Sequence, residues 1–135
     1  MATSKLSQSS SLPIAASVIG TIFLGFGIKF CLQPSSSIPF FEFKAPTSTP
    51  DQKIADALTL LYAVRDIFMG VAIYAATYFG NRKSLGWILI AASGVAYADG
   101  FIVKAQIGKG EWNHWGYAPM LTVVGSLLLG ALDRA

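Results

Sequence analysis

Three charged residues lie deep inside apolar stretches that are long enough to cross a lipid bilayer. Arg65 and Asp66 stand in the middle part of residues 54–80, and Asp99 lies in the next apolar stretch. Charged side chains at membrane depth are costly, and they usually face a protein interior or a water-filled cavity. We therefore take Arg65, Asp66 and Asp99 as the candidate catalytic residues.

Two carboxyl groups and one guanidinium group suit general acid–base chemistry. Consecutive helical residues point about 100° apart, so Arg65 is expected to pair with Asp99 across the helix interface rather than with Asp66. Such a site keeps one carboxylate ionised beside the arginine and raises the pKa of the other until it carries a proton. One base and one acid are then held together. A purely structural Arg–Asp pair and ion translocation are the alternatives.

The elements that must position these residues are four apolar runs at residues 12–32, 54–80, 85–107 and 115–132. Each is close to the roughly 20 residues of a transmembrane helix, and none has the period-two alternation of a membrane barrel. The predicted fold is all-α: one integral-membrane four-helix bundle over residues 1–135, with helices at about 12–32, 51–80, 84–107 and 115–132. We expect the first run to be retained, since no small-x-small cleavage site follows it.

A tight turn at residues 80–84 makes the second and third helices antiparallel neighbours. Thr49 is expected to cap the second helix, and Ser84 to cap the third. Arg65, Asp66 and Asp99 then lie roughly 12–15 Å from the same membrane face. Side chains expected to contact a substrate there are Tyr62, Met69, Tyr97, His114 and Trp115. The aromatic connectors, with Phe40, Phe41, Phe43, Trp112 and Trp115, predict either an interfacial belt or a lid over a lipophilic ligand.

Composition excludes several other classes of function. Only 13% of the residues are charged, against about 25% in soluble domains. The net charge of +3 is not gathered into a basic stripe, so no nucleic-acid partner is expected. A lone His114 does not make a zinc site, and no phosphate-binding loop, dinucleotide fingerprint or nucleophile elbow occurs. We expect no metal and no cofactor.

The segments "RDIFMG" (residues 65–70) and "ADG" (residues 98–100) carry a resemblance. From the first apolar run onward, the chain resembles the small four-helix integral-membrane epoxide hydrolases of fungal polyketide pathways, of the aurovertin and citreoviridin type. These lie within a broader family of small membrane proteins of largely unknown function. The resemblance implies water-assisted opening of an epoxide on a lipophilic polyketide or polyene, with Asp66, Arg65 and Asp99 as the site.

In this reading Asp66 is assigned as the base and Asp99 as the acid, with the two roles exchangeable. The implied partners are the lipid bilayer and a lipophilic epoxide, and the implied compartment is the endoplasmic reticulum membrane. A homo-oligomer and an association with pathway enzymes both stay open. The alternatives are a covalent ester route, an epoxide-opening cyclase or isomerase, and a non-catalytic accessory or scaffold protein.

Overall fold

The computed structural model describes residues 5–133, and this part of the chain is helical and contains no strand. Its long helices are α1 (Ser11–Leu32), α3 (Thr49–Tyr78), α4 (Arg82–Ile107) and α6 (Ala118–Leu128). Two single-turn helices lie in the connectors, α2 (Ser37–Phe40) and α5 (Trp112–Trp115), with 3-10 turns η1 (Leu6–Gln8) and η2 (Pro34–Ser36). The all-α fold class is confirmed, and the two ends of the predicted 1–135 domain lie outside the described residues.

Three of these helices are long and apolar enough to cross a membrane. They are α1, α3 and α4, with 22, 30 and 26 residues. At about 1.5 Å per residue, each reaches the roughly 30 Å of a hydrocarbon core. Large apolar side chains such as Phe68 and Trp87 are 70% and 63% exposed on them. Such surfaces suit lipid, so the helices have the length and composition of membrane-spanning segments.

The fourth apolar run differs from its prediction. It was expected to form one spanning helix at 115–132, but α5 ends at Trp115 and α6 has only 11 residues. A helix of that length covers roughly 16 Å, about half of a hydrocarbon core. Pro119 lies in the first turn of α6, where its missing N–H is tolerated, and Gly130 adopts a positive φ just after the helix. Apolarity continues through these breaks, but the helix does not.

The ends of the helices are set by local hydrogen bonds. Ser48, rather than Thr49, caps α3, since its Oγ accepts the backbone N–H of Asp51 at 3.2 Å. At the next turn, the Asn81 side chain accepts the N–H of Ser84 at 3.0 Å, and Ser84 Oγ accepts the N–H of Asn81 at 3.1 Å. Ser84 is thus the reciprocal partner of the cap. This capping box starts α4 directly after α3 and makes the two helices antiparallel.

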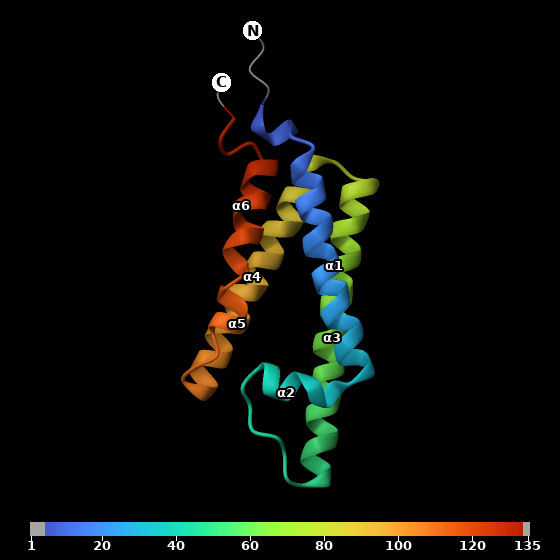
Figure 1. The fold of residues 1–135 in the computed structure, drawn as a ribbon, viewed down its shortest axis with the longest axis vertical. Helices are drawn as coiled ribbons and strands as arrows, with labels where there is room; N and C mark the ends of the chain where they lie inside the picture. Colours follow the sequence, from blue (N-terminus) through green and yellow to red (C-terminus); the bar gives the residue numbers. More distant parts are fainter. Residues whose placement is uncertain (1–4, 134–135) are drawn as a thin grey trace.

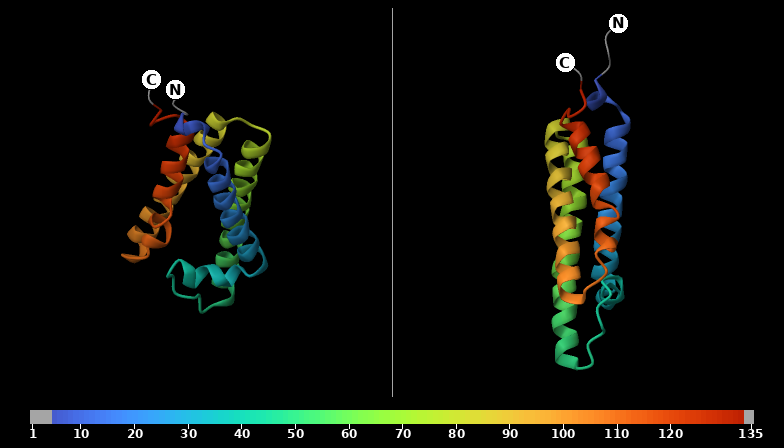
Figure 2. Two further views of the ribbon diagram at one scale, coloured as in Figure 1. Left: turned by 45° about the horizontal axis from the view of Figure 1, so that its top comes forward. Right: turned by 90° about the vertical axis from the view of Figure 1, so that its left-hand side faces the viewer.

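The helices form two pairs, α1 with α3 and α4 with α6. In Figure 1 both termini lie at the same end, and α2 crosses the opposite end. Figure 2 shows that the two pairs lie close together at the end with the termini and diverge toward the end with α2. The two helix pairs are therefore arranged as a wedge, which is narrow at the end with the termini and wide at the end with the connectors.

Glycines allow each pair to pack closely. A Cβ added at Gly70 of α3 would lie 2.8 Å from the Gly20 carbonyl oxygen of α1. A Cβ added at Gly86 of α4 would lie 2.9 Å from the Gly125 carbonyl oxygen of α6. Both distances are shorter than ordinary contacts, so only glycine fits at these positions. Small residues at helix interfaces are the usual device for close backbone approach in membranes.

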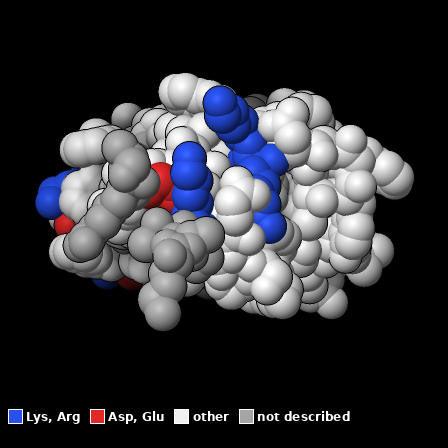
Figure 3. Space-filling model, turned by 90° about the horizontal axis from the view of Figure 1, so that it is seen from above, with Lys and Arg blue, Asp and Glu red and all other residues white. Residues whose placement is uncertain are grey.

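Polar side chains tie the chain together at the end with the termini. Ser7 donates its N–H and its Oγ–H to the Asp133 carboxylate at 2.9 and 2.6 Å, and these hydrogen bonds hold the pKa of Asp133 below its ordinary value. Arg82 donates to the carbonyl oxygens of Ser7 and Ser9 at 3.0 and 2.8 Å. Lys and Arg side chains are prominent on this end (Figure 3). The narrow end of the wedge is thereby fixed.

Polar contacts link the connectors at the opposite, wide end of the wedge. Asn113 donates from Nδ2 to the Phe40 carbonyl oxygen at 2.7 Å. Lys109 pairs with Glu42 at 2.9 Å, and Lys104 pairs with Glu111 at 2.9 Å. The hydrogen bond from Lys104 lowers the pKa of Glu111. The α2 connector is therefore attached to the segment around α5, across the wide end of the wedge.

Alanine substitutions at two glycines of α4 test the packing of α4 on α6. Gly86→Ala should lower the free energy of unfolding by about 1–3 kcal/mol, because the added methyl group overpacks the interface between α4 and α6. Gly94→Ala is the matched control, since no atom lies within 4 Å of its added Cβ. Unfolding of both variants in detergent checks this. Equal stabilities would contradict the close packing at Gly86.

Candidate functional site

An ion pair joins α3 to α4 at the centre of the candidate site. Arg65 donates from Nη1 and Nη2 to the two carboxylate oxygens of Asp99, at 3.1 and 2.7 Å. The Arg65 guanidinium also lies over the Tyr62 ring, 4.2 Å from its centroid. This two-point arrangement is the strong form of an Arg–carboxylate contact. The pairing that helix geometry predicted is present.

Asp66 lies on another face of α3 and has no such partner. Its residue is only 5% exposed, and its carboxyl group makes no hydrogen bond with any residue of the described part of the chain. It lines a cavity of about 230 Å³. A single water molecule needs a cavity of roughly 10–15 Å³. The cavity beside Asp66 therefore has room for a molecule much larger than water. Asp66 is therefore a buried carboxyl group that faces an available space.

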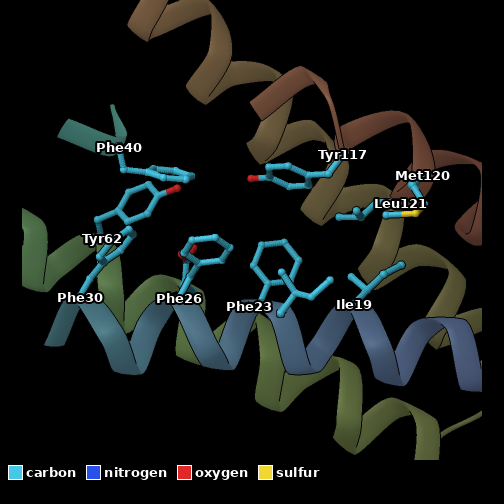
Figure 4. A pocket seen from close by; sticks show the side chains of 11 residues that line it. Ile19, Phe23, Phe26, Phe30, Phe40, Tyr62, Tyr117, Met120 and Leu121 are labelled. Atoms are coloured by element: carbon cyan, nitrogen blue, oxygen red, sulfur yellow. The ribbon is translucent and has the colours of Figure 1, made fainter. Parts of the chain in front are cut away.

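The cavity occupies the wedge between the two helix pairs, and its lining is mostly aromatic and aliphatic (Figure 4). Helix α1 contributes one face, α2 and α3 contribute another, and the start of α6 contributes the third. The lining residues are Ile19, Ile22, Phe23, Phe26, Phe30, Phe40, Tyr62, Asp66, Tyr117, Met120 and Leu121. The only polar side-chain groups in this set are the carboxyl group of Asp66 and the hydroxyl groups of Tyr62 and Tyr117.

The rim of the cavity lies between α1 and α6. Ile22 of α1 and Met120 of α6 both line the cavity and are 47% and 50% exposed, so they also form part of the outside surface. For helices that span a membrane, this outside surface faces lipid. The cavity therefore opens to the surface of the protein between α1 and α6.

Asp99 faces a different space. It lines a smaller hollow of about 150 Å³ together with Phe41, Phe43, Tyr62, Ile102, Val103 and His114. Tyr62 is the residue shared with the Asp66 cavity. The three charged residues thus lie near one another, while the two carboxyl groups face adjoining spaces with Tyr62 between them.

His114 is enclosed by aromatic rings beside the Asp99 hollow. It is 1% exposed, and its ring stacks on Phe41 at 5.4 Å with an interplanar angle of 5°. Neither ring nitrogen has a hydrogen-bond partner within residues 5–133. Burial lowers the pKa of His114, so the imidazole is neutral at neutral pH. His114 lines the Asp99 hollow and does not line the Asp66 cavity.

The other residues expected to bind substrate are dispersed. Met69 lies in the main hydrophobic core. Trp115 donates from Nε1 to the Tyr97 carbonyl oxygen at 3.2 Å and packs on Phe101 at 4.9 Å. Neither Tyr97 nor Trp115 lines the Asp66 cavity or the Asp99 hollow. Of the five expected contacts, Tyr62 is the one that reaches the Asp66 cavity.

The expected aromatic lid is divided in the same way. Phe40 lines the Asp66 cavity, and Phe41 and Phe43 line the Asp99 hollow. Trp112 is 72% exposed and lies outside both spaces. Of the five aromatic residues expected in a lid, those that line these spaces therefore come from the α2 connector.

Two groups of residues that line the cavity were not predicted from the sequence. Phe23, Phe26 and Phe30 line it from α1, and their spacing of three and four residues places them on one helical face. That pattern is visible in the sequence. Tyr117 also lines the cavity, but it precedes α6 in a turn, where no local periodicity indicates its direction.

No metal site is evident in the part of the chain that the structure describes. Within it, no three His, Cys, Asp or Glu residues are grouped so that they could hold a metal ion.

The fold and the site define a small helical membrane protein with a buried carboxyl group in an apolar cavity. Residues 20–128 match the family described as "Domain of unknown function (DUF4267)", and the chain belongs to that family. The match covers α3, α4, α6 and most of α1, and thus all the residues that line the cavity except Ile19. No curated protein and no solved structure matches the chain.

The two carboxyl groups should differ in their effect on stability. Asp99→Asn removes the charge that pairs with Arg65, so it should lower stability by about 1.5–3 kcal/mol, as expected for hydrogen bonds to a charged group. Asp66→Asn breaks no interaction between described side chains, so it should leave stability within about 0.5 kcal/mol. Thermal unfolding of both variants in detergent checks the difference. A larger loss for Asp66→Asn would mean that this carboxyl group has a structural role.

Proposed function

We propose that this protein is a membrane-embedded epoxide hydrolase that acts on a lipophilic substrate. The observation that carries the proposal is the unpaired Asp66 carboxyl group in an otherwise apolar, aromatic cavity. A carboxyl group in such surroundings is suited to proton transfer. The resemblance of "RDIFMG" and "ADG" to the integral-membrane epoxide hydrolases supplies the reaction type.

The proposed substrate is a polyketide or polyene that carries an epoxide and reaches the cavity from the bilayer. The half-exposed rim residues Ile22 and Met120 support entry between α1 and α6. The aromatic side chains Phe23, Phe26 and Phe30 provide flat apolar surfaces for an unsaturated chain. The proposed compartment is the endoplasmic reticulum membrane, with fungal secondary metabolism as the setting, and this part rests on the resemblance alone.

The ion pair supports a specific assignment of the two carboxyl groups. Asp99 accepts two hydrogen bonds from Arg65, which stabilise its ionised form. Asp66 has no cationic partner in contact, and an ionised carboxylate without one is costly in an apolar place. We therefore assign Asp66 as the proton donor and Asp99 as the base, which exchanges the roles assigned from the sequence.

The proposed reaction balances as a simple hydration. The oxygen of a water molecule forms a bond to one epoxide carbon while the bond from that carbon to the epoxide oxygen breaks. The epoxide oxygen takes the proton of Asp66, and Asp99 takes a proton from the attacking water. Return of a proton from Asp99 to Asp66 restores both groups. A water that approaches from the Asp99 hollow passes Tyr62, which lines both spaces.

A second route within the same site is epoxide opening by a hydroxyl group of the substrate. The apolar lining of the cavity favours it, because it limits the water beside the reacting carbon. The product would then be a cyclic ether instead of a diol. In both routes Asp66 donates a proton to the epoxide oxygen.

Substitution of the carboxyl groups tests the proposal. Asp66→Asn and Asp99→Asn should each lower the rate of epoxide opening by about 10²- to 10⁴-fold, the usual contribution of a general acid or base. Asp56→Asn is the matched control on α3, since Asp56 bonds Gln52 near the start of the helix and lines neither space. Purified protein in detergent is mixed with a lipophilic epoxide, and the diol or cyclic ether is measured by mass spectrometry.

The same assay separates the remaining alternatives. Full activity of both Asn variants would overturn the assignment of the site. A single turnover in ¹⁸O-labelled water distinguishes water attack, which labels the product, from a covalent ester, which labels the protein. Wild-type protein that opens no epoxide, with the Asn variants affecting stability alone, would favour an accessory or scaffold role.

A further inference from the structure

Two tyrosine hydroxyl groups face each other inside the Asp66 cavity. Tyr62 projects from α3 and Tyr117 from the turn before α6, and Figure 4 shows their hydroxyl groups pointing toward one another. Neither hydroxyl makes a hydrogen bond with a residue in the range 5–133, whereas the hydroxyl of Tyr74 bonds Thr21 at 2.6 Å. Tyrosine hydroxyls in apolar surroundings normally have a partner. These two are therefore donors that a ligand can satisfy.

The rest of the cavity limits what that ligand is. Apart from the Asp66 carboxyl group, the other lining side chains are aromatic or aliphatic. A pure hydrocarbon would fill the cavity but leave both hydroxyls unpaired. A charged group would find no free cation there, because Arg65 is occupied by Asp99 and does not line the cavity. The fitting ligand is apolar along its length and has one uncharged acceptor oxygen near the two hydroxyls.

We propose that Tyr62 and Tyr117 together bind a single uncharged oxygen atom, such as that of an epoxide, ether or ketone, within a lipophilic ligand. Such an oxygen has two lone pairs and can accept two hydrogen bonds at once. The two donors come from opposite helix pairs, Tyr62 from the α1–α3 side and Tyr117 from the α4–α6 side. The ligand oxygen is thereby held across the wedge, at the level of Asp66.

This inference deepens the proposed function, and its chemical step rests on that function. When the epoxide carbon–oxygen bond breaks, the oxygen keeps the electron pair and becomes an alkoxide with three lone pairs. Two of them stay with the tyrosines, and the third takes the proton of Asp66. The contact with Asp66 is thus gained as the bond breaks, which favours the transition state over the bound substrate. Tyr62 and Tyr117 position the oxygen for this transfer.

Binding of an unreactive ligand tests the pair without any turnover. The probes are a dialkyl ketone with its carbonyl in mid-chain and the straight alkane of equal length. The ligand-dependent rise in unfolding temperature of the purified protein in detergent gives both affinities. Tyr62→Phe and Tyr117→Phe should each weaken ketone binding roughly three- to tenfold, which is the loss of one uncharged hydrogen bond, and should leave alkane binding unchanged. Tyr74→Phe is the control that removes a hydroxyl outside the cavity.

The outcomes separate this inference from the proposed function. Equal weakening for ketone and alkane, unchanged ketone binding in both variants, or a wild-type protein with no preference for the ketone would each overturn the oxygen site. A wild-type protein that prefers the ketone and opens no epoxide would leave the oxygen site standing and overturn the hydrolase. Tyr62 also contacts Arg65, so if Tyr62→Phe does not fold, Tyr117→Phe decides alone.

Discussion

The ion pair between Arg65 and Asp99 determines what the remaining carboxyl group can do. It joins α3 to α4 by two hydrogen bonds and occupies the guanidinium. One positive and one negative charge then cancel at membrane depth, where an unpaired charge is costly. Asp66 is left without a cationic partner, and α3 directs it into the cavity rather than toward α4. A site with one paired and one unpaired carboxyl group follows from that single pairing.

The space for the cavity comes from unequal packing of the helices. Gly20, Gly70, Gly86 and Gly125 bring the backbones together within each helix pair. The pairs themselves are tied at the end with the termini by Arg82 and Asp133, and they diverge from there (Figure 2). Large aromatic rings partly fill the divergence. Rings such as those of Phe26 and Phe30, whose centroids lie 5.8 Å apart, line the space that remains.

The sequence predicted the helices and the ion pair because both depend on local geometry. The lengths of the apolar stretches predict α1, α3 and α4. The tight turn from Asn81 to Ser84 then brings Arg65 and Asp99 to the same depth along the helices. The short α6 was not predicted, since hydropathy does not register the interruption at Gly116 and Tyr117 between α5 and α6. Nor was the division of the two carboxyl groups between adjoining spaces, which depends on the Tyr62 side chain. Tyr117 was missed because its direction is set by tertiary packing of a turn.

The arrangement of polar groups keeps the proposed acid and the proposed base in separate spaces. Two carboxyl groups facing one small apolar space would interact strongly, and the pair would titrate together. Here Tyr62 stands between them, and Arg65 lies over its ring at 4.2 Å. The paired guanidinium of Arg65 offsets the charge of Asp99 at the Asp66 cavity. In the proposed reaction Asp66 acts as the proton donor and the Arg65-paired Asp99 as the base, so one cation serves a site with two carboxyl groups.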